Sequence, residues 1–327
     1  MIRLSIISAL VCVSATAVHA QSGPVAWWPL DDGAGLAASE LVHGLGSTLS
    51  SNNGTTGPRW VEGQGAGDGT IPPIDCNRDA LHFDGVDDYV SIPDVRPEVE
   101  LDGFGALTLS AWVRRTSDAG GAIVSKYDSR PGWWIPWVIS IYPGQLGGVR
   151  FFVGTSLEVY RGVDTTVGVT RDRWTHIAGV WQGTDFTVYI DGLPAPGTMF
   201  QKGNFAGMYE DDDVPIEIGS VRSSSGSFTG RDAFFQGGID DVRVYDRALS
   251  GDEIATLALG GDALATCDSC PIDCQDTTPE RVLFGVVRRA SDDSLGSVMC
   301  WTLETGGVDC RRDARGALLV GPPECGP

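Results

Sequence analysis

The stretch Gly237–Tyr245, Gly-Gly-Ile-Asp-Asp-Val-Arg-Val-Tyr, decides the fold that we predict for this chain. It begins with a glycine pair, continues with the residues of a β-strand, and leads into a short capped helix. Alternate side chains of a strand share a face, so Val242 and Val244 predict an apolar face that packs inward. Asp240 falls on that same face of a regular strand. Because a buried carboxylate has to be hydrogen-bonded, neutralised or bound to a metal ion, Asp240 is the sharpest chemical anomaly in the sequence.

The rest of the chain, up to about residue 261, has the same strand character. Short alternating segments are separated by turn residues, and long segments with helical periodicity are nearly absent. Ser250-Gly251-Asp252-Glu253 is a capping box that predicts a helix over 252–259. This pattern predicts an all-β fold, an antiparallel two-sheet sandwich with one short C-terminal helix. The predicted strands are 25–30, 80–83, 89–92, 107–113, 122–127, 137–141, 149–153, 174–181, 186–190, 215–220 and 236–245.

The amino terminus has the features of a secretory signal peptide. Arg3 precedes an apolar segment, 4–17, and a small-residue cleavage site ends at Ala20. That segment is too short for a membrane span, so we predict cleavage after Ala20 and export. A lipoprotein signal at Cys12 is disfavoured because Val11 is not a small residue. The predicted segments are a signal peptide (1–20), a sandwich domain (21–261) and a small cysteine-rich module (262–327).

The charge of the chain excludes some classes of partner. Its formal net charge is −20 at pH 7. Such a protein repels nucleic acid and anionic lipid and favours solubility and divalent cations. The solvated surface of a secreted protein accounts for much of this charge as well.

Six of the eight cysteines lie in the module 262–327. An exported compartment permits disulfides, and six cysteines allow 15 pairings. A zinc knuckle is the alternative, but zinc sites usually have paired Cys or Cys/His arms and the module contains no histidine. We therefore predict disulfides there and leave Cys76 as the candidate free thiol. The cysteines predicted to pair are Cys267, Cys270, Cys274, Cys300, Cys310 and Cys325.

Several motifs together resemble the LamG-like jelly-roll domains of the concanavalin A-like class, in the order of that family. The resemblance covers residues 25–259 and leaves out the cysteine-rich module. It implies a two-sheet jelly roll that binds carbohydrates or proteins at cell surfaces, frequently with calcium. The motifs are Trp28–Gly33, Leu81–Val90, Leu109–Val113, Ile123–Tyr127, Trp174–Ala178, Val188–Gly192, Ile218-Gly219 and Gly238–Ser250.

The resemblance also implies a structural Ca²⁺ site. In related glucanases, calcium joins an acidic turn after the first strand to an aspartate that opens the last strand. The matching positions are Asp32, with the backbone near Gly33, and Asp240. Calcium takes six to eight oxygen ligands, which include backbone carbonyls. The alternative is that Asp240 accepts hydrogen bonds from backbone N–H groups or pairs with an arginine such as Arg243.

A second acidic turn, at Asp84, Asp87 and Asp88, gives a second choice of metal site through Asp84 and Asp88. An Asx-turn at Asp84-Gly85 explains the same residues without a metal ion. A solvated turn is therefore the simpler interpretation.

Enzymes of this broad class need carboxylates that the sequence does not offer in the expected pattern. Glycoside hydrolysis uses two carboxylates across the scissile bond. The Glu-x-Asp-x-x-Glu run of related glucanases is absent, and the predicted strands 107–113, 137–141 and 149–153 carry no acid. We expect a non-catalytic protein, with a glycosidase or lyase of the same fold as a distant alternative.

The expected ligand site follows the densest aromatic cluster, residues 132–137. Trp134 lies on one face of a strand there and Trp133 on the other, and aromatic rings are common platforms for sugars and protein partners. Plain core packing is the alternative for this cluster. We expect Trp134, Trp133, Tyr127 and Asp128 to bind a glycan. Cell-surface adhesion or another extracellular protein–protein interaction is the second candidate function.

Overall fold

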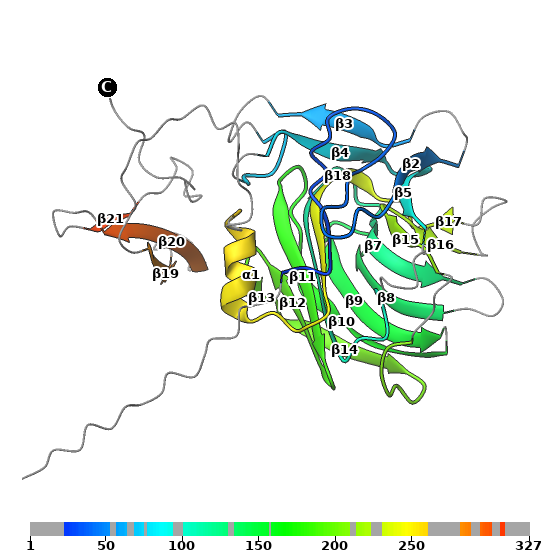
Figure 1. Ribbon diagram of the computed structural model, residues 1–327. Coiled ribbons are helices and arrows are strands. Elements are labelled where there is room, and N and C mark those ends of the chain that lie inside the picture. The colour runs from blue at the N-terminus through cyan, green and yellow to red at the C-terminus, as the bar shows by residue number, and fades with distance from the viewer. Residues whose placement is uncertain are drawn as a thin grey trace, which may run out of the picture.

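The computed structural model describes residues 23–52, 57–63, 69–74, 77–93, 101–129, 134–156, 158–209, 214–223 and 231–260, together with the backbone of three further strands. Residues 23–260 form two facing sheets with one helix (Figure 1). The predicted signal peptide lies outside the described residues. None of the helices that the structure describes is long and apolar enough to cross a membrane.

The first sheet has eight strands in the order β13-β12-β11-β6-β18-β4-β3, and β1 pairs with β18. All of its pairings are antiparallel. The strands are β1 (Ala26–Trp28), β3 (Arg59–Glu62), β4 (Asp79–Asp84), β6 (Ala106–Arg115), β11 (Thr175–Gln182), β12 (Asp185–Ile190), β13 (Leu193–Pro194) and β18 (Gln236–Tyr245).

The second sheet has ten strands in the order β14-β10-β9-β8-β7-β15-β5-β2, with β16 and β17 beside β7. Its pairings are antiparallel except for the single β16–β7 contact. The strands are β2 (Thr48–Ser51), β5 (Asp88–Ile92), β7 (Gly121–Asp128), β8 (Trp134–Ile141), β9 (Gly148–Ser156), β10 (Val159–Gly168), β14 (Gly197–Lys202), β15 (Ile216–Ile218), β16 (Val221–Arg222) and β17 (Arg231–Asp232).

The core lies between the two sheets and takes alternate residues from each strand. On β9, Val149, Phe151 and Val153 are fully buried in it. On β11 and β12, Ile177 and Val188 face them from the first sheet. The predicted all-β, two-sheet jelly-roll sandwich with one short helix is therefore confirmed.

The helix α1 (Gly251–Ala258) begins as predicted. Ser250 accepts a hydrogen bond from the backbone N–H of Glu253, and the Glu253 carboxylate accepts one from the N–H of Ser250. Ile254 and Leu257 pack on Ala178 of the first sheet, on the face that points away from the core. The helix that this capping box begins thus packs on the outer face of the first sheet.

The β11–β12 hairpin is tighter than the sequence predicts. Gln182 pairs with Asp185, which leaves a two-residue loop of Gly183 and Thr184. Gly183 has φ of +58°, a conformation that glycine adopts without strain. The predicted strands 174–181 and 186–190 left four residues between them, and two of these, Gln182 and Asp185, extend the strands.

The prediction that Asp240 shares a face with Val242 and Val244 is wrong. Ile239 pairs with Val113 and faces the core, whereas Asp240 pairs with Trp112 on the opposite, outer face of the first sheet. The register then shifts between Asp240 and Arg243, so Val242 and Val244 return to the core. This β-bulge inserts one residue, which reverses the alternation.

The side chain of Asp240 is nevertheless fully buried. Ile71, Trp112 and Trp174 form a small apolar cluster on the same outer face, apart from the main core. Asn77, from the segment before β4, bonds Asp240 there. Asp240 is therefore buried beneath chain segments that cover the first sheet, and not between the sheets.

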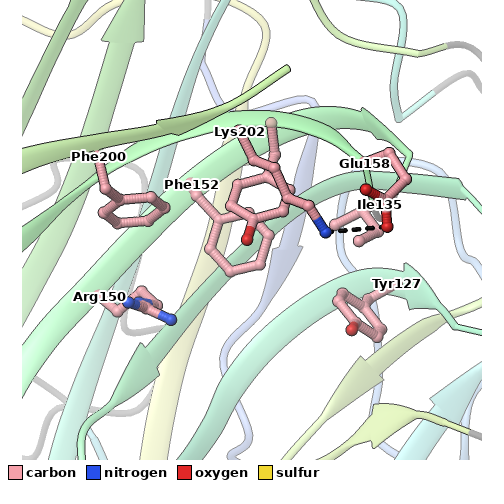
Figure 2. Close-up of a pocket in the computed structure, with 8 residues that line it drawn as sticks. Tyr127, Ile135, Arg150, Phe152, Glu158, Phe200 and Lys202 are labelled. Carbon is pink, nitrogen blue, oxygen red and sulfur yellow. Dashed lines mark hydrogen bonds and ion pairs between the residues drawn. The ribbon is translucent and has the colours of Figure 1, made fainter. Parts of the chain in front are cut away.

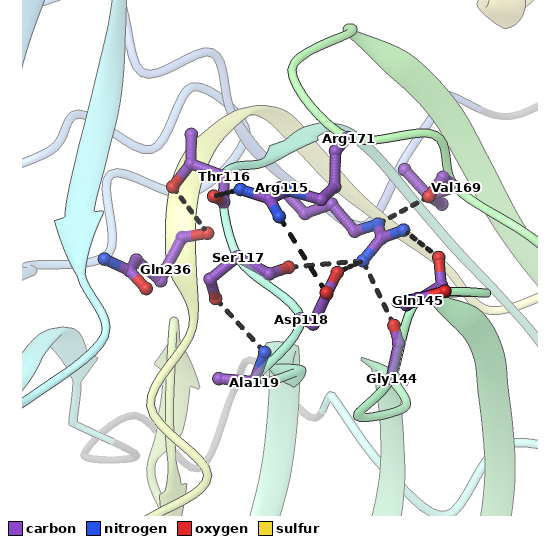
Figure 3. Close-up of polar contacts among 10 residues, drawn as sticks. All are labelled: Arg115, Thr116, Ser117, Asp118, Ala119, Gly144, Gln145, Val169, Arg171 and Gln236. Atoms are coloured by element: carbon purple, nitrogen blue, oxygen red, sulfur yellow. Dashed lines mark hydrogen bonds and ion pairs between the residues drawn. The ribbon is translucent and has the colours of Figure 1, made fainter.

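One end of the sandwich is held by the buried guanidinium of Arg115, at the end of β6 (Figure 3). Its Nε donates to the carbonyl of Val169 (2.5 Å) and its Nη2 to that of Gln145 (2.5 Å). Its Nη1 donates to the carbonyl of Gly144 (3.2 Å) and pairs with Asp118 (3.0 Å). One side chain thus links the turns that follow β6, β8 and β10.

Three further strands, β19 (Val282–Arg288), β20 (Leu295–Thr302) and β21 (Val308–Cys310), form a separate antiparallel sheet. Its register places Cys300 opposite Cys310. The side chains of these two cysteines are not among the described ones. Five further cysteines lie wholly outside the described residues: Cys76, Cys267, Cys270, Cys274 and Cys325. The predicted disulfides and the free Cys76 remain predictions.

Candidate functional site

A pocket of about 390 Å³ lies on the outer face of the second sheet, over strands β7 to β10 and β14. On β9 the alternation that buries Val149, Phe151 and Val153 turns Arg150 and Phe152 outward. This opposite face carries the pocket. The lining residues are Tyr127, Ile135, Arg150, Phe152, Glu158, Tyr160, Phe200 and Lys202.

Three half-buried aromatic side chains of the pocket, Phe152, Tyr160 and Phe200, lie near Gly162 of β10. Figure 2 shows Phe152 and Phe200 among the lining residues. Gly162 on β10 pairs with Phe152 on one side and with Phe200 on the other. The ring of Tyr160 lies 5.6 Å from that of Phe152 and 6.0 Å from that of Phe200, and the two phenylalanine rings are 6.2 Å apart. A Cβ at position 162 would lie 2.3 Å from the carbonyl oxygen of Phe151, so this position requires glycine.

Paired charges border the aromatic rings. The guanidinium of Arg150 binds both carboxylate oxygens of Asp164, at 2.7 and 2.8 Å, and lies 4.5 Å from the centre of the Phe200 ring. The ammonium group of Lys202 pairs with Glu158 at 2.9 Å. Both cations at the pocket therefore have a carboxylate partner, and a neutral polar ligand would meet fixed donors and acceptors beside an apolar surface.

Among the predicted ligand residues, Tyr127 lines this pocket. Its ring lies 6.5 Å from that of Phe152, and burial raises the pKa of its phenol. Asp128 is buried next to it, with Arg222 at 3.9 Å. Trp134 is paired with Asp128 in the backbone register, but its side chain and the whole of Trp133 lie outside the described residues.

The sequence analysis missed Tyr160, Phe200 and Lys202, because it predicted no strand over β10 or β14. Residues 159–168 contain three valines, a tyrosine and two threonines, which are residue types that favour strands. That enrichment was the available signal, and glycines at both ends of the valine-rich part concealed it. Without these strands the aromatic residues of the second sheet could not be grouped.

At the predicted metal centre, Asp240 accepts two hydrogen bonds. Its Oδ2 accepts from the amide of Asn77 (2.6 Å) and its Oδ1 from the N–H of Asp241 (2.9 Å). Burial, and then the nearby carboxylate of Asp31, raises the pKa of Asp240 well above its usual value. Arg243 pairs with Asp241 at 3.0 Å.

The amino-terminal turn reaches this centre through Asp31. Burial raises the pKa of Asp31 as well, although its Oδ1 accepts backbone hydrogen bonds from Arg78 and Asp79. Asp32 accepts hydrogen bonds from the backbone and hydroxyl of Ser39. Gly33 lies against Asp79, because a Cβ there would be 2.8 Å from the Asp79 carboxylate.

The donor chemistry around Asp240 fits a hard cation. The carboxylates of Asp31 and Asp240 offer oxygen atoms of the kind that Ca²⁺ takes, and the carboxylates of Asp31 and Asp79 repel each other. The pKa values of Asp31, Asp79 and Asp240 are all raised, first by burial. A bound cation would favour the ionised form of all three.

The second-choice metal residues, Asp84 and Asp88, do come together with Asp87. Their carboxylate oxygens lie within 4.8 Å of one another. Asp84 accepts hydrogen bonds from the N–H groups of Val86 (2.8 Å) and Asp87 (3.2 Å), which is the Asx-turn of the simpler interpretation. Burial first raises the pKa of Asp88, to about 6.

Comparison with known proteins places these features in a family. The sequence model of the concanavalin A-like lectin/glucanases superfamily matches residues 84–255, more than half of the chain. The chain belongs to this superfamily. The match covers most of the second sheet and the whole aromatic pocket, as well as Asp240 and the first residues of the capped helix of this concanavalin A-like domain. No curated protein matches the chain.

Solved structures similar to this concanavalin A-like chain share its fold at low identity. Domain 4 of AbnA, an extracellular arabinanase from Geobacillus stearothermophilus in complex with arabinotriose, is 20% identical with a TM-score of 0.48, over 72% of this chain and 98% of that one. The binding domain of Paraclostridial Mosquitocidal Protein 1 is 13% identical with a TM-score of 0.50, over 85% of this chain and 63% of that one. The binding domain of botulinum neurotoxin serotype G is 12% identical with a TM-score of 0.48, over 72% of this chain and 50% of that one. The match thus spans less than two thirds of either toxin domain.

Proposed function

We propose that this protein is an exported, non-catalytic carbohydrate-binding protein, and that the pocket around Gly162 binds a neutral glycan. The observation that carries the proposal is the group of Phe152, Tyr160 and Phe200, which stay half-buried on an outer sheet face where no core packing holds them. Amphipathic rings of this kind pack on the apolar faces of sugar rings, while nearby polar groups fix the hydroxyls.

The charges at the pocket support a neutral ligand. Arg150 and Lys202 are already paired with Asp164 and Glu158. The chain as a whole has a net charge of −20, which repels polyanions over long range.

The same pairs support a binding role in preference to hydrolysis. A glycosidase needs one carboxylate as an acid and a second as a base or nucleophile across the scissile bond. Glu158 bonds Lys202 at 2.9 Å, and Asp164 bonds Arg150 through both of its oxygens. Each carboxylate is thus already engaged by a cation.

A glycan array followed by calorimetry on the full chain tests the proposal. Tyr160→Ala and Phe200→Ala each remove one ring and should weaken glycan binding about 5- to 30-fold, as expected for the loss of about 1–2 kcal/mol of ring contact. Met199→Ala is the matched control, because Met199 neighbours Phe200 on β14 and is not among the residues lining the pocket.

Equal binding by all three variants would refute the assignment to this pocket. Binding to cells or matrix proteins, without binding to any neutral glycan, would favour the second candidate function, adhesion through protein contacts. Turnover of a polysaccharide would support the enzyme alternative.

We also propose that Asp240, with the carboxylate of Asp31, binds a structural Ca²⁺. The buried carboxylate and the raised pKa values of the neighbouring acids support this proposal. The cation would join the turn after β1 to β18, and the test is given with the predictions below.

A further inference from the structure

A row of basic residues crosses four adjacent strands of the first sheet. Arg59 on β3 pairs with His82 on β4, His82 with Gly238 on β18, and Gly238 with Arg114 on β6. Residues that are directly opposite in antiparallel strands share a face. The neighbouring row, Trp60–Leu81–Ile239–Val113, faces the core, so the basic row lies on the outer face.

These two arginines differ from most of the other arginines that the structure describes. Neither Arg59 nor Arg114 has an ion pair or a side-chain hydrogen bond within the described part of the chain. The Nε of Arg114 is buried without a partner, which is costly for a charged group. By contrast, Arg115, the next residue, pairs with Asp118, and Arg243 on the same sheet pairs with Asp241. A chain with a net charge of −20 has ample acids with which to neutralise two cations, and here it does not.

The surroundings hold the middle of the row rigid. Gly238 contributes no side chain, and the indole of Trp174 lies directly on it, since a Cβ there would be 2.5 Å from the ring. The Trp174 Nε1 donates to the carbonyl of Thr70 at 3.1 Å, which fixes the ring. His82 and Arg114 are half-buried on either side, and Arg59 is exposed at the edge.

The charges of the two arginines act on His82, which lies between them in the row. Burial lowers the pKa of His82, and the charges of Arg59 and Arg114 lower it further, so both guanidinium groups lie near the imidazole. Asp84 acts on His82 in the opposite sense, but its Oδ1 is engaged by two backbone N–H groups of its own turn.

We propose that Arg59, His82 and Arg114 form a binding site for an oxyanion, either a sulfate, a phosphate or a carboxylate group. Guanidinium groups bind such oxygens through two parallel hydrogen bonds, and histidine adds a third donor once it is protonated. The ligand is either a free inorganic ion or an acidic group of a polysaccharide. This site is on the opposite sheet from the aromatic pocket, so it stands or falls independently of the proposed function.

Sulfate is the first probe, measured on the full chain by calorimetry and thermal unfolding against sodium chloride of equal ionic strength. Sulfate should bind and raise the melting temperature beyond the effect of chloride. Arg59→Gln and Arg114→Gln should each weaken sulfate binding at least about 10-fold, because each removes a charge-assisted contact. Arg161→Gln is the matched control, since Arg161 also has no ion pair among the described residues and lies on β10 of the second sheet.

Nuclear magnetic resonance of His82 gives a readout that does not depend on stability. Sulfate should shift the imidazole signals and raise the histidine pKa in the wild type, and should do neither in the double variant Arg59→Gln/Arg114→Gln. An unchanged His82 signal, or equal responses to sulfate and chloride, overturns the proposal. If Arg114→Gln does not fold, Arg59→Gln alone decides the matter, because Arg59 is exposed.

Two further ligands separate the sources of the oxyanion. Tighter binding of a uronic-acid oligosaccharide than of acetate or sulfate identifies an acidic polysaccharide, and tighter binding of sulfate or phosphate identifies a free ion. A neutral oligosaccharide that displaced sulfate from this row would contradict the assignment.

Discussion

Lowering the pH should destabilise this protein through His176, a buried residue of β11. Its side chain is 1% exposed and lies edge-on to Trp112, with ring centres 5.6 Å apart. Neither ring nitrogen has a hydrogen-bond partner. Burial first, and then the charge of Arg243, lowers the pKa of His176 from 6.5 to about 3.

The sign follows from the difference between the folded and unfolded states. Between pH 6.5 and 3 the unfolded chain binds a proton at His176 that the folded chain does not. The contribution of neutral His176 to the free energy of unfolding is thus complete above pH 6.5 and is lost progressively as the pH falls toward 3. At 1.36 kcal/mol per pKa unit, the loss between pH 7.5 and 4.5 is about 2.7 kcal/mol.

Urea unfolding of the wild type and His176→Leu at these two pH values isolates this effect. Leucine is close to histidine in volume, does not titrate and leaves no buried nitrogen unpaired, so the variant should be as stable as the wild type at pH 7.5 or about 1 kcal/mol more stable. At pH 4.5 its advantage should grow by about 2.7 kcal/mol. His43→Leu, at an exposed position, controls for the loss of a histidine.

The comparison between variants is needed because Asp88 acts in the opposite direction. Its folded pKa is raised to about 6, so its contribution is complete below pH 3.8 and is lost as the pH rises through 6. Asp88 is present in both proteins and cancels in the difference. Parallel pH profiles for the wild type and His176→Leu would show that His176 is solvated or hydrogen-bonded in solution, and would refute the reasoning.

Three further predictions concern other parts of the molecule. Millimolar Ca²⁺ should stabilise the wild type and raise its melting temperature. At a Ca²⁺ concentration 100 times the dissociation constant, the free energy of unfolding should increase by about 2.7 kcal/mol. Asp240→Asn should not respond to Ca²⁺, and an equal shift in both proteins would place the ion elsewhere. Lys126→Met should lower the free energy of unfolding in urea by about 3–5 kcal/mol. The fully buried carboxylate of Asp102, which lies 2.8 Å from the Lys126 ammonium, loses its cation in this variant. The double variant Lys126→Met/Asp102→Leu should recover most of the loss. Digestion without reductant should yield a peptide pair joined through Cys300 and Cys310, since opposite residues of antiparallel strands lie within the Cα separation of a disulfide, and separate peptides would disprove the link.

The periodicity of the sequence predicted the sandwich because one face of each strand has to be buried. Leu109, Ala111 and Val113 alternate with polar or amphipathic residues on β6, and this alternation fixes the core face without knowledge of the partner strand. The same local logic gave α1, whose capping box satisfies backbone N–H groups within four residues. Signals of this kind are complete within a short segment.

The position of Asp240 could not be predicted in this way. The extra residue in β18 appears only when its register with β6 is known, and Asp241 takes φ of +48° there, which the sequence gives little reason to expect. A strand that is regular in sequence therefore reverses its alternation midway. Asp240, which indicated a metal centre, belongs to the outer face as a result.

The pocket and the basic row show why sites were harder to predict than the fold. In a two-sheet sandwich the hydrophobic pattern specifies one face of each sheet, and it is silent about the other. Tyr160, Gly162 and Phe200 gain meaning only when β10 and β14 align them, and Arg59 and Arg114, 55 positions apart, meet only through β4 and β18. A ligand site on an outer face is therefore specified by register rather than by composition, and a shift of one residue in β10 would turn Tyr160 to the core face without changing the sequence at all.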